Sequence, residues 1–123
     1  MVNLDTHVFL FVVAGTLRPR ELAALRGQLW GVSSLVLWEI WRLHEARKID
    51  LGLDDAHLQR VLSEVRVWPV TEEVARTAAR LDFRADPCDE LIAATSLVHN
   101  APLLTRDRRI SASKVVPLAL RQR

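Results

Sequence analysis

The chain has one cysteine, four glycines and no long hydrophobic run. Cys88 has no second cysteine to pair with, so an internal disulfide is excluded and nothing indicates an oxidising compartment. A reducing cytoplasm fits this composition best. Linkers rich in Gly, Ser or Pro, internal repeats and low-complexity segments are also lacking. With 50% hydrophobic and 26% charged residues, the sequence predicts a single domain over residues 1–123.

One apolar run, residues 8–14, needs a separate explanation. It is far too short to span a bilayer. No Lys or Arg precedes it, and Asp5 stands where a secretory signal has its basic end. We therefore expect this run to belong to the folded core, and we expect no association with a membrane.

The charge is balanced but unusual in type. The net charge is +2, and arginine supplies fifteen of the 17 basic residues. The planar guanidinium fork suits phosphate, which favours a nucleic-acid partner. A solvated surface rich in arginine explains the composition at least as well, so this observation alone decides nothing.

Short apolar runs alternate along the chain with segments of helical periodicity. A strand is expected over residues 1–4, followed by a helix over residues 6–14. Pro69 places a strand at residues 67–70 on a sheet edge, because proline donates no backbone hydrogen bond. Further helices are expected to start at Pro19, at Ser33 or Ser34 (ending at about Arg47), after a cap at Asp54, at Thr71 and at Asp86-Pro87. Further strands are expected near Val32 and at residues 103–104. Residues 114–118 are a candidate last strand.

This alternation predicts an α/β fold of three layers, with a parallel sheet and helices on both faces. In such sheets the ligand site lies beyond the carboxyl ends of the strands, near a switch in strand order. Asp5 and Asp107 each follow a predicted strand. Asp89 lies in the first turn of the helix that leads into the strand at residues 103–104. Glu39 joins them if its helix starts at the same edge.

Three of these acids have an ordinary structural explanation when each is taken alone. Asp5 can cap the helix that follows it, and Asp107 can stabilise a turn. Asp89 can face the positive end of a helix dipole. For any one residue, the structural explanation is the stronger one.

Glu39 lies among Leu35, Trp38, Ile40 and Trp41, so its helix is apolar on nearly every side. That pattern predicts a buried helix. A buried glutamate needs a partner, which can be a metal ion or Arg42 about one turn further on. Both alternatives remain open from the sequence.

Several carboxylates that meet at one strand edge repel each other and take up protons unless a cation neutralises them. Oxygen ligands suit Mg²⁺ or Mn²⁺, whereas zinc prefers His and Cys, and the four histidines show no metal-binding spacing. A divalent ion lowers the pKa of a bound water and stabilises charge on a phosphodiester oxygen. The acids therefore predict a site for metal-assisted phosphodiester hydrolysis.

Four segments of the sequence resemble the motifs of the PIN-domain family. Residues 3–7 (NLDTH) are similar to its opening, a strand followed by Asp and then Thr or Ser. Residues 33–40 (SSLVLWEI) resemble the second motif, and residues 49–51 the strand-like stretch that often follows it. Residues 86–95 (DPCDELIAAT) and residues 103–107 (LLTRD) resemble the third and fourth motifs. The four appear in the order of the family and span nearly the whole chain.

The resemblance is nearest to the VapC type of bacterial toxin. It implies a PIN-like fold and a Mg²⁺- or Mn²⁺-dependent endoribonuclease that is commonly dimeric and is held inactive by an antitoxin. It also implies that the metal ligands and catalytic acids are Asp5, Glu39, Asp89 and Asp107. The sequence departs from the family pattern at Glu90, where many members have Arg, and in a smaller way at Ser34.

Residues next to the acids are candidates for supporting roles. Thr6 and Thr105 are expected to orient the acidic ligands. Arg106, Arg108 and Arg109 are candidates to hold the RNA backbone, although a charge run of this kind is as readily a solvated turn. Trp30, Trp38 and Trp41 fit either a dimer contact or core packing.

Two other classes of function compete with the nuclease. One is a non-catalytic PIN-like module that binds RNA or a protein, with an idle acidic site; the presence of all four acids argues against it. The other is a phosphoryl-transfer or receiver-like α/β domain. The run Asp5-Thr6-His7 lacks the second Asp of a phosphatase-type motif, which argues against that reading.

Overall fold

A four-stranded parallel sheet forms the centre of the molecule. The computed structural model describes residues 1–121. The strand order is β3-β2-β1-β4, and each neighbouring pair is parallel. The strands are β1 (Val2–Leu4), β2 (Trp30–Ser33), β3 (Arg66–Trp68) and β4 (Leu103–Leu104).

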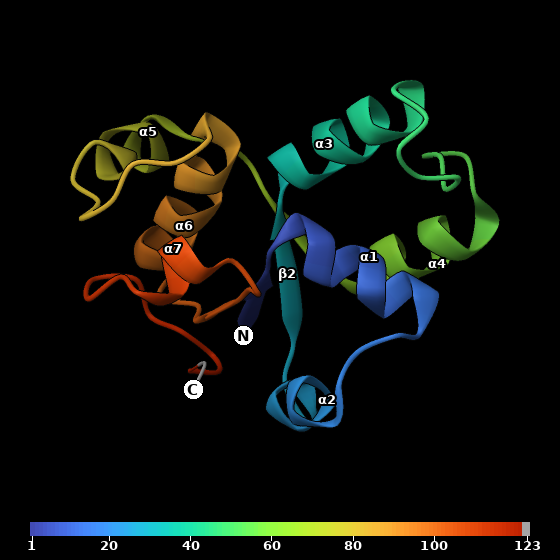
Figure 1. Ribbon diagram of the computed structural model, residues 1–123, viewed down its shortest axis with the longest axis horizontal. Helices are drawn as coiled ribbons and strands as arrows, with labels where there is room; N and C mark the ends of the chain where they lie inside the picture. Colours follow the sequence, from blue (N-terminus) through green and yellow to red (C-terminus); the bar gives the residue numbers. More distant parts are fainter. Residues whose placement is uncertain (122–123) are drawn as a thin grey trace.

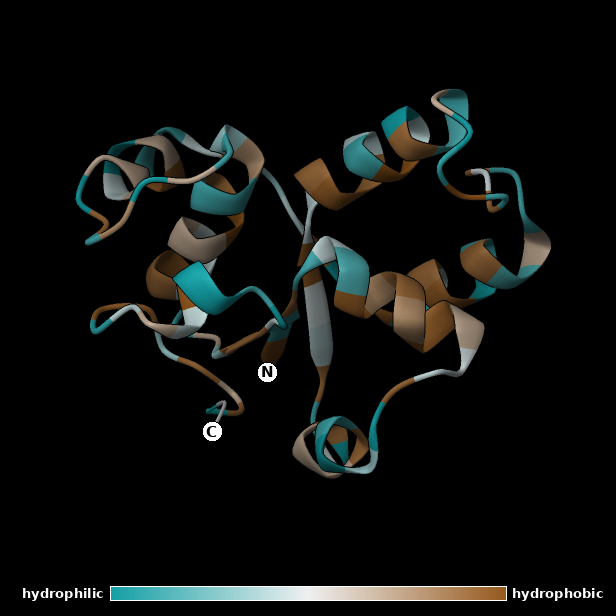
Figure 2. Cartoon of the chain, in the orientation of Figure 1, coloured by the Kyte–Doolittle hydropathy of each residue, from teal (hydrophilic) through white to brown (hydrophobic). Residues whose placement is uncertain are grey.

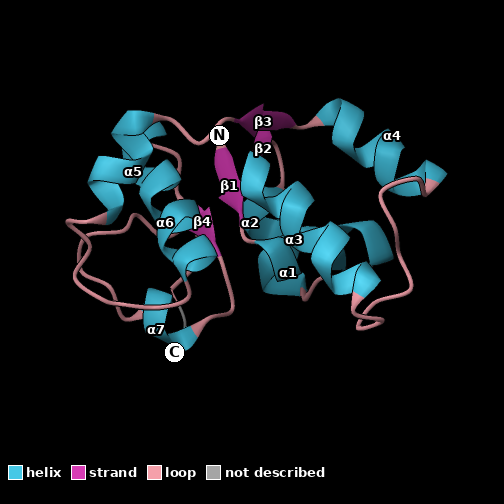
Figure 3. Ribbon diagram, turned by 90° about the horizontal axis from the view of Figure 1, so that it is seen from above, coloured by secondary structure: helices cyan, strands magenta, loops and turns pink. Residues whose placement is uncertain are grey.

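Helices cover both faces of the sheet, so the predicted three-layer α/β fold is confirmed (Figures 1 and 3). On one side lie α1, α3 and α4, and on the other lie α5, α6 and α7. The bounds of the helices are α1 (Thr6–Ala14), α2 (Pro19–Leu25), α3 (Ser34–Glu45), α4 (Ala56–Glu64), α5 (Glu72–Ala78), α6 (Pro87–His99) and α7 (Arg108–Ser111).

The core is apolar and lies between the sheet and these helices. The run at residues 8–14 is part of α1, which is coloured mostly hydrophobic after its first turn (Figure 2). Phe9 of this helix is completely buried. Within the described residues, no helix is long and apolar enough to cross a membrane.

The sequence specifies the helix ends that matter for the site. Asp5 is the N-cap of α1, and Gly15 ends this helix in the left-handed conformation with φ of 71°. Asp86 is the N-cap of α6, where Pro87 occupies the first turn, and its carboxylate accepts a 3.0 Å hydrogen bond from the Cys88 N–H. Asn100 ends α6 with φ of 50°. These caps match the predicted starts of both helices.

The order in which strands are added to the sheet changes direction between β3 and β4. From β1 the chain moves outward to β2 and then to β3, which lies at an edge as Pro69 predicted. It then returns through α5 and α6 to place β4 on the far side of β1. The switch point therefore lies between β1 and β4, and Asp5 and Thr105 directly follow these two strands.

One buried polar contact ties the first strand to α6. The Asn3 side chain is fully buried and donates to the Ile92 carbonyl at 3.1 Å and to the Ser96 hydroxyl at 2.9 Å. These bonds fix the position of α6 along the direction of β1. They therefore also fix the position of the first turn of α6, in which Asp89 lies.

Two details of the predicted pattern are wrong, and one short helix was not predicted. Asp55 rather than Asp54 caps α4, because it is the Asp55 carboxylate that accepts from the Leu58 N–H. Residues 114–118 form no strand, and only an isolated bridge joins Leu103 to Leu118. The polar turn after β4 continues into the short helix α7.

The expectation that α3 is buried is also wrong. Val36 and Ile40 are its buried residues, whereas Trp38 and Trp41 are 48% and 49% exposed. The helix packs one face on the core and presents the other to the surface. Apolar composition on every side therefore does not show that this helix is enclosed.

Candidate active site

Asp5 lies at the carboxyl end of β1 and is held by both of its oxygens. Oδ1 accepts from the Thr6 N–H at 2.8 Å, and Oδ2 accepts from the Thr105 hydroxyl at 2.6 Å. The side chain is buried, and burial is the main reason why the pKa of Asp5 is raised above its usual range. The hydrogen bond from Thr105 opposes this rise. Asp5 is therefore a helix cap and a fixed, partly desolvated carboxylate at the same time.

Glu39 is oriented by the residue that follows Asp5. The Thr6 hydroxyl donates to Glu39 Oε1 at 2.6 Å and so joins α1 to α3. Burial is the largest cause of the raised pKa of Glu39, and the charges of Asp5 and Asp86 add to it. Residues 1–121 contain no ion pair between Glu39 and Arg42, because Arg42 instead places its guanidinium 4.7 Å from the centre of the Trp38 ring.

Asp107 is connected to the same site through Thr105. The Thr105 hydroxyl accepts from the Asp107 N–H at 3.0 Å while it donates to Asp5. The Asp107 carboxylate caps α7 by accepting from the Ile110 N–H at 3.0 Å. One threonine hydroxyl thus links the carboxyl ends of β1 and β4. The expected orienting positions of Thr6 and Thr105 correspond to these contacts.

Asp89 has the most perturbed carboxylate of the site. It is half-buried, and within the described part of the chain nothing donates a hydrogen bond to it. Burial is the main reason why its pKa is raised to about 7, and neighbouring carboxylates add to the rise. In order of effect, these neighbours are Asp5, Glu39, Asp107 and Asp86.

The structure thus brings the four predicted acids into one electrostatic cluster and adds Asp86 as a fifth member. After burial, the charges of these neighbouring carboxylates contribute to the raised pKa of Asp89. Among residues 1–121, however, no three side chains of the His, Cys, Asp or Glu type are arranged around one point that could hold a metal ion. The carboxylates are electrostatic neighbours whose oxygens do not yet converge.

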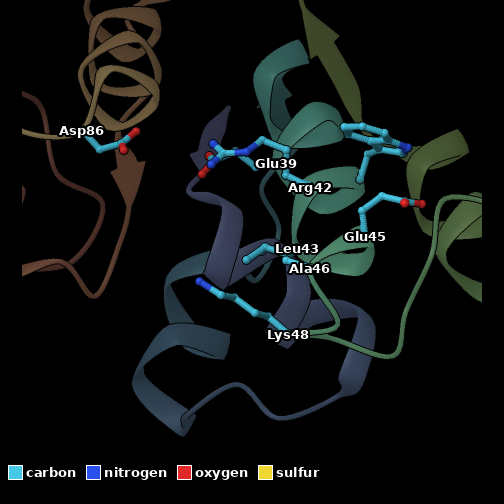
Figure 4. Close-up of a pocket in the computed structure, with 8 residues that line it drawn as sticks. Glu39, Arg42, Leu43, Glu45, Ala46, Lys48 and Asp86 are labelled. Carbon is cyan, nitrogen blue, oxygen red and sulfur yellow. The ribbon is translucent and has the colours of Figure 1, made fainter.

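A pocket of about 460 Å³ opens beside this cluster. Glu39 and Asp86 line it from opposite sides, and Arg42 and Lys48 also contribute to its wall (Figure 4). Asp86 was expected to be a structural cap, which it is. Its place in the pocket is a second role that its N-cap position concealed.

Glu90 takes no part in the acidic cluster. Its Oε2 accepts from the Ala85 N–H at 2.9 Å, so the side chain turns back onto the loop before α6. Where many family members have a cation, this chain has an internal brace for that loop.

Arg106 is engaged within the protein. Its Nε and Nη2 donate to the two carboxylate oxygens of Glu21 at 2.8 and 2.7 Å, and its guanidinium lies 3.8 Å from the centre of the Phe11 ring. This hydrogen bonding is the main cause of the lowered pKa of the buried Glu21. No local pattern predicts this pair, because 85 residues separate the partners. Its consequence is that α2 anchors the turn between Thr105 and Asp107.

The other two arginines of that turn differ from each other. Arg109 donates to the Arg84 carbonyl at 3.0 Å, and Arg108 is exposed. Of the three arginines, Arg108 has the greatest freedom to meet a ligand.

Comparison with known proteins agrees with the motifs and the fold. Residues 2–115 match the model of the PIN domain, so the chain belongs to the PIN-domain family. It is 32% identical over 122 residues to ribonuclease VapC22 of Mycobacterium tuberculosis, an alignment that covers 92% of each chain. The resemblance to VapC-type PIN domains is therefore confirmed.

Solved structures with the same fold include two toxin–antitoxin assemblies. The VapBC2 complex of Rickettsia felis bound to a promoter DNA fragment matches with a TM-score of 0.73 at 18% identity, over 96% of this chain and 97% of that one. A toxin–antitoxin complex from Klebsiella pneumoniae matches with the same TM-score at 16% identity, over 96% of each chain. FitAcB of Neisseria gonorrhoeae matches with a TM-score of 0.56 at 24% identity, over 89% of this chain and 90% of that one.

The raised pKa of Asp89 predicts how stability varies with pH in metal-free protein. Folded Asp89 titrates near pH 7 and unfolded Asp near 3.8, so between these values the folded state binds more protons. The free energy of unfolding therefore falls as pH rises from about 4 to 7. Urea titrations at pH 5 and pH 8 should show that Asp89→Asn reduces this fall. The control Asp54→Asn, which removes an exposed carboxylate, should show the same fall in the free energy of unfolding as the wild type. If Asp89→Asn also shows the full fall, Asp89 is not the group that causes it.

Asp86 and Asp89 should separate stability from catalysis. Asp86→Ala removes the cap of α6 and should cost about 0.5–2 kcal/mol of stability with a modest effect on RNA cleavage. Asp89→Asn keeps the shape but removes one carboxylate of the predicted metal-binding set, so cleavage should fall by orders of magnitude with little loss of stability. Thermal melts and cleavage rates on both variants decide the point. If Asp86→Ala is the inactive enzyme and Asp89→Asn only the less stable one, the third acidic ligand is wrongly assigned.

Proposed function

We propose that this chain is a VapC-type endoribonuclease, the toxin of a toxin–antitoxin pair, that hydrolyses RNA phosphodiester bonds with Mg²⁺ or Mn²⁺ held by Asp5, Glu39, Asp89 and Asp107. One observation carries the proposal: these carboxylates share a cluster at the switch point of the sheet, where burial and then the charges of the neighbouring acids raise the pKa of Asp89 to about 7. Family membership and the ribonuclease relative support the same conclusion.

The donor set fits a hard divalent cation. All candidate ligands are carboxylate oxygens, and the uncompensated repulsion at Asp89 is what a cation would relieve. Asp5 and Glu39 are already oriented by hydroxyl donors, whereas Asp89 has no such restraint among the described residues. We therefore assign Asp5 and Glu39 as the preformed part of the site. Asp89 would complete the ligand set in its ionised form.

The chemistry divides between the ion and the protein. When bound, the ion supplies a water of lowered pKa and stabilises charge on the phosphodiester oxygens. The protein's own part is to keep the ligands ionised and in place. Thr105 stabilises the charged form of Asp5, and Thr6 does so for Glu39, because both hydroxyls donate to carboxylate oxygens. In the Thr105–Asp107 turn, Arg106 serves as a brace through Glu21. Arg108 is the arginine of this turn that we assign to the RNA backbone, with Arg109 beside it.

The proposed partners follow from the family. We assign a cognate antitoxin to this chain because its structural neighbours include toxin–antitoxin complexes. A homodimer rests on the family alone, because the exposed Trp38 holds Arg42 and the exposed Trp41 lines the pocket beside the acids. Trp30 is not available for such a contact, because its indole N–H donates to the Leu25 carbonyl and its ring packs on the core. We expect the activity in the cytoplasm, where an RNA substrate is at hand.

Cleavage should require the ion and Asp5. Incubation of purified protein with RNA should give cleavage with Mn²⁺ or Mg²⁺ and none with excess chelator. Asp5→Asn retains one acceptor for the Thr6 N–H and the shape of the side chain, so it should stay folded yet lose at least about 100-fold in rate, since a metal ligand is weakened. Full activity in chelator would exclude the metal mechanism. Binding of RNA without cleavage by the wild type under any metal would favour the non-catalytic module instead.

A further inference from the structure

An acidic site that cuts a polyanion needs cations nearby that are not already neutralised. Arg106 is bound to Glu21, and Arg109 donates to a backbone carbonyl. Two other cations, Arg42 and Lys48, line the same pocket as Glu39 and Asp86. Neither Arg42 nor Lys48 forms an ion pair with any residue in the described part of the chain. They are therefore free to meet an anion from outside.

Arg42 is held in an extended position that faces the site. Its guanidinium lies over the ring of Trp38, one turn earlier on α3, at 4.7 Å from the ring centre. In Figure 4, Arg42 and Glu39 extend toward the side on which Asp86 lies.

Lys48 is fixed by the way in which α3 ends. Arg47 adopts a left-handed conformation with φ of 58°, the Lys48 N–H donates to the Leu43 carbonyl, and the Arg47 N–H donates to the His44 carbonyl. This is a Schellman motif, which closes the C-terminus of a helix and sets the direction of the chain after it. It places Lys48 on the wall of the pocket near Leu43 and Ala46 (Figure 4).

We propose that Arg42 and Lys48 form the phosphate-binding wall for single-stranded RNA on the α3 side of the active site. They hold phosphates next to the bond that is cut, where the strand leaves the acidic cluster. The inference rests on the proposed ribonuclease activity and names the path of its substrate. Charge contacts of this kind supply affinity without reading sequence.

The test measures RNA binding separately from cleavage. A fluorescently labelled uridine oligomer is titrated with the inactive Asp5→Asn protein at several KCl concentrations. For single strands, log Kd rises by about 0.7 for each tenfold increase in salt and for each phosphate that the protein neutralises. Adding Arg42→Gln and Lys48→Gln should therefore reduce the slope of log Kd against log salt by about 1.4, and Lys48→Gln alone by about 0.7.

A matched control removes the same charges elsewhere. Arg60 and Lys114 are exposed and line none of the walls of this pocket. The pair Arg60→Gln and Lys114→Gln should leave the slope within error of the Asp5→Asn parent. Thermal melts of all variants check that each is folded. If the Arg42 variant does not fold, the salt slope of Lys48→Gln alone still tests the proposal.

Three outcomes would overturn the inference. The first is an unchanged slope in the Arg42 and Lys48 variant, and the second is an equal loss in the control. The third is that the Arg42 and Lys48 variant no longer binds a co-expressed antitoxin but still binds RNA, which would assign this wall to the protein partner. Each is distinct from failure of the proposed function, which would appear as a wild-type protein that does not cleave RNA with Mn²⁺ or Mg²⁺.

Discussion

Repulsion between carboxylates at the carboxyl edge of the sheet is the constraint around which this molecule is built. Parallel strands end at one edge, and the chain places an acid directly after β1 and another just beyond β4. The N-terminal turn of α6 and the middle of α3 bring Asp89 and Glu39 to the same place. Burial first, and then the charges of these neighbours, raise the pKa of Asp89. A divalent cation would convert the cost of this repulsion into binding energy.

Two of the acids cap helices and also belong to the proposed metal site. Asp5 and Asp107 both cap helices, and both contact the Thr105 hydroxyl, which donates to the Asp5 carboxylate and accepts from the Asp107 N–H. The cap contacts restrict each carboxylate before any ligand arrives, so less conformational entropy is lost on binding. Asp89 differs, because Asp86 performs the capping of α6 and leaves Asp89 free of hydrogen bonds within the described residues. A fixed pair and a movable acid in one cluster suit a site that must take up an ion.

Local patterns predicted most of the fold, and tertiary contacts account for what they missed. Asp86-Pro87 and Thr71 were sufficient to start α6 and α5, because capping is a property of a few neighbouring residues. The four acids could be collected from their places after strands and in a first turn. The Glu21–Arg106 pair could not, since neither residue has a local signal for the other. The exposure of Trp38 and Trp41 was equally hidden, because composition does not report which faces of a helix find neighbours.

The central claim is that the four carboxylates become the ligands of one metal centre. Crystals soaked in Mn²⁺ and measured for anomalous scattering test it most directly. We expect an anomalous peak bounded by Asp5, Glu39, Asp89 and Asp107, with the Asp89 carboxylate turned toward it, and no peak at that place in the Asp5→Asn protein. A peak at another position in a protein that cleaves RNA with Mn²⁺ would contradict the account.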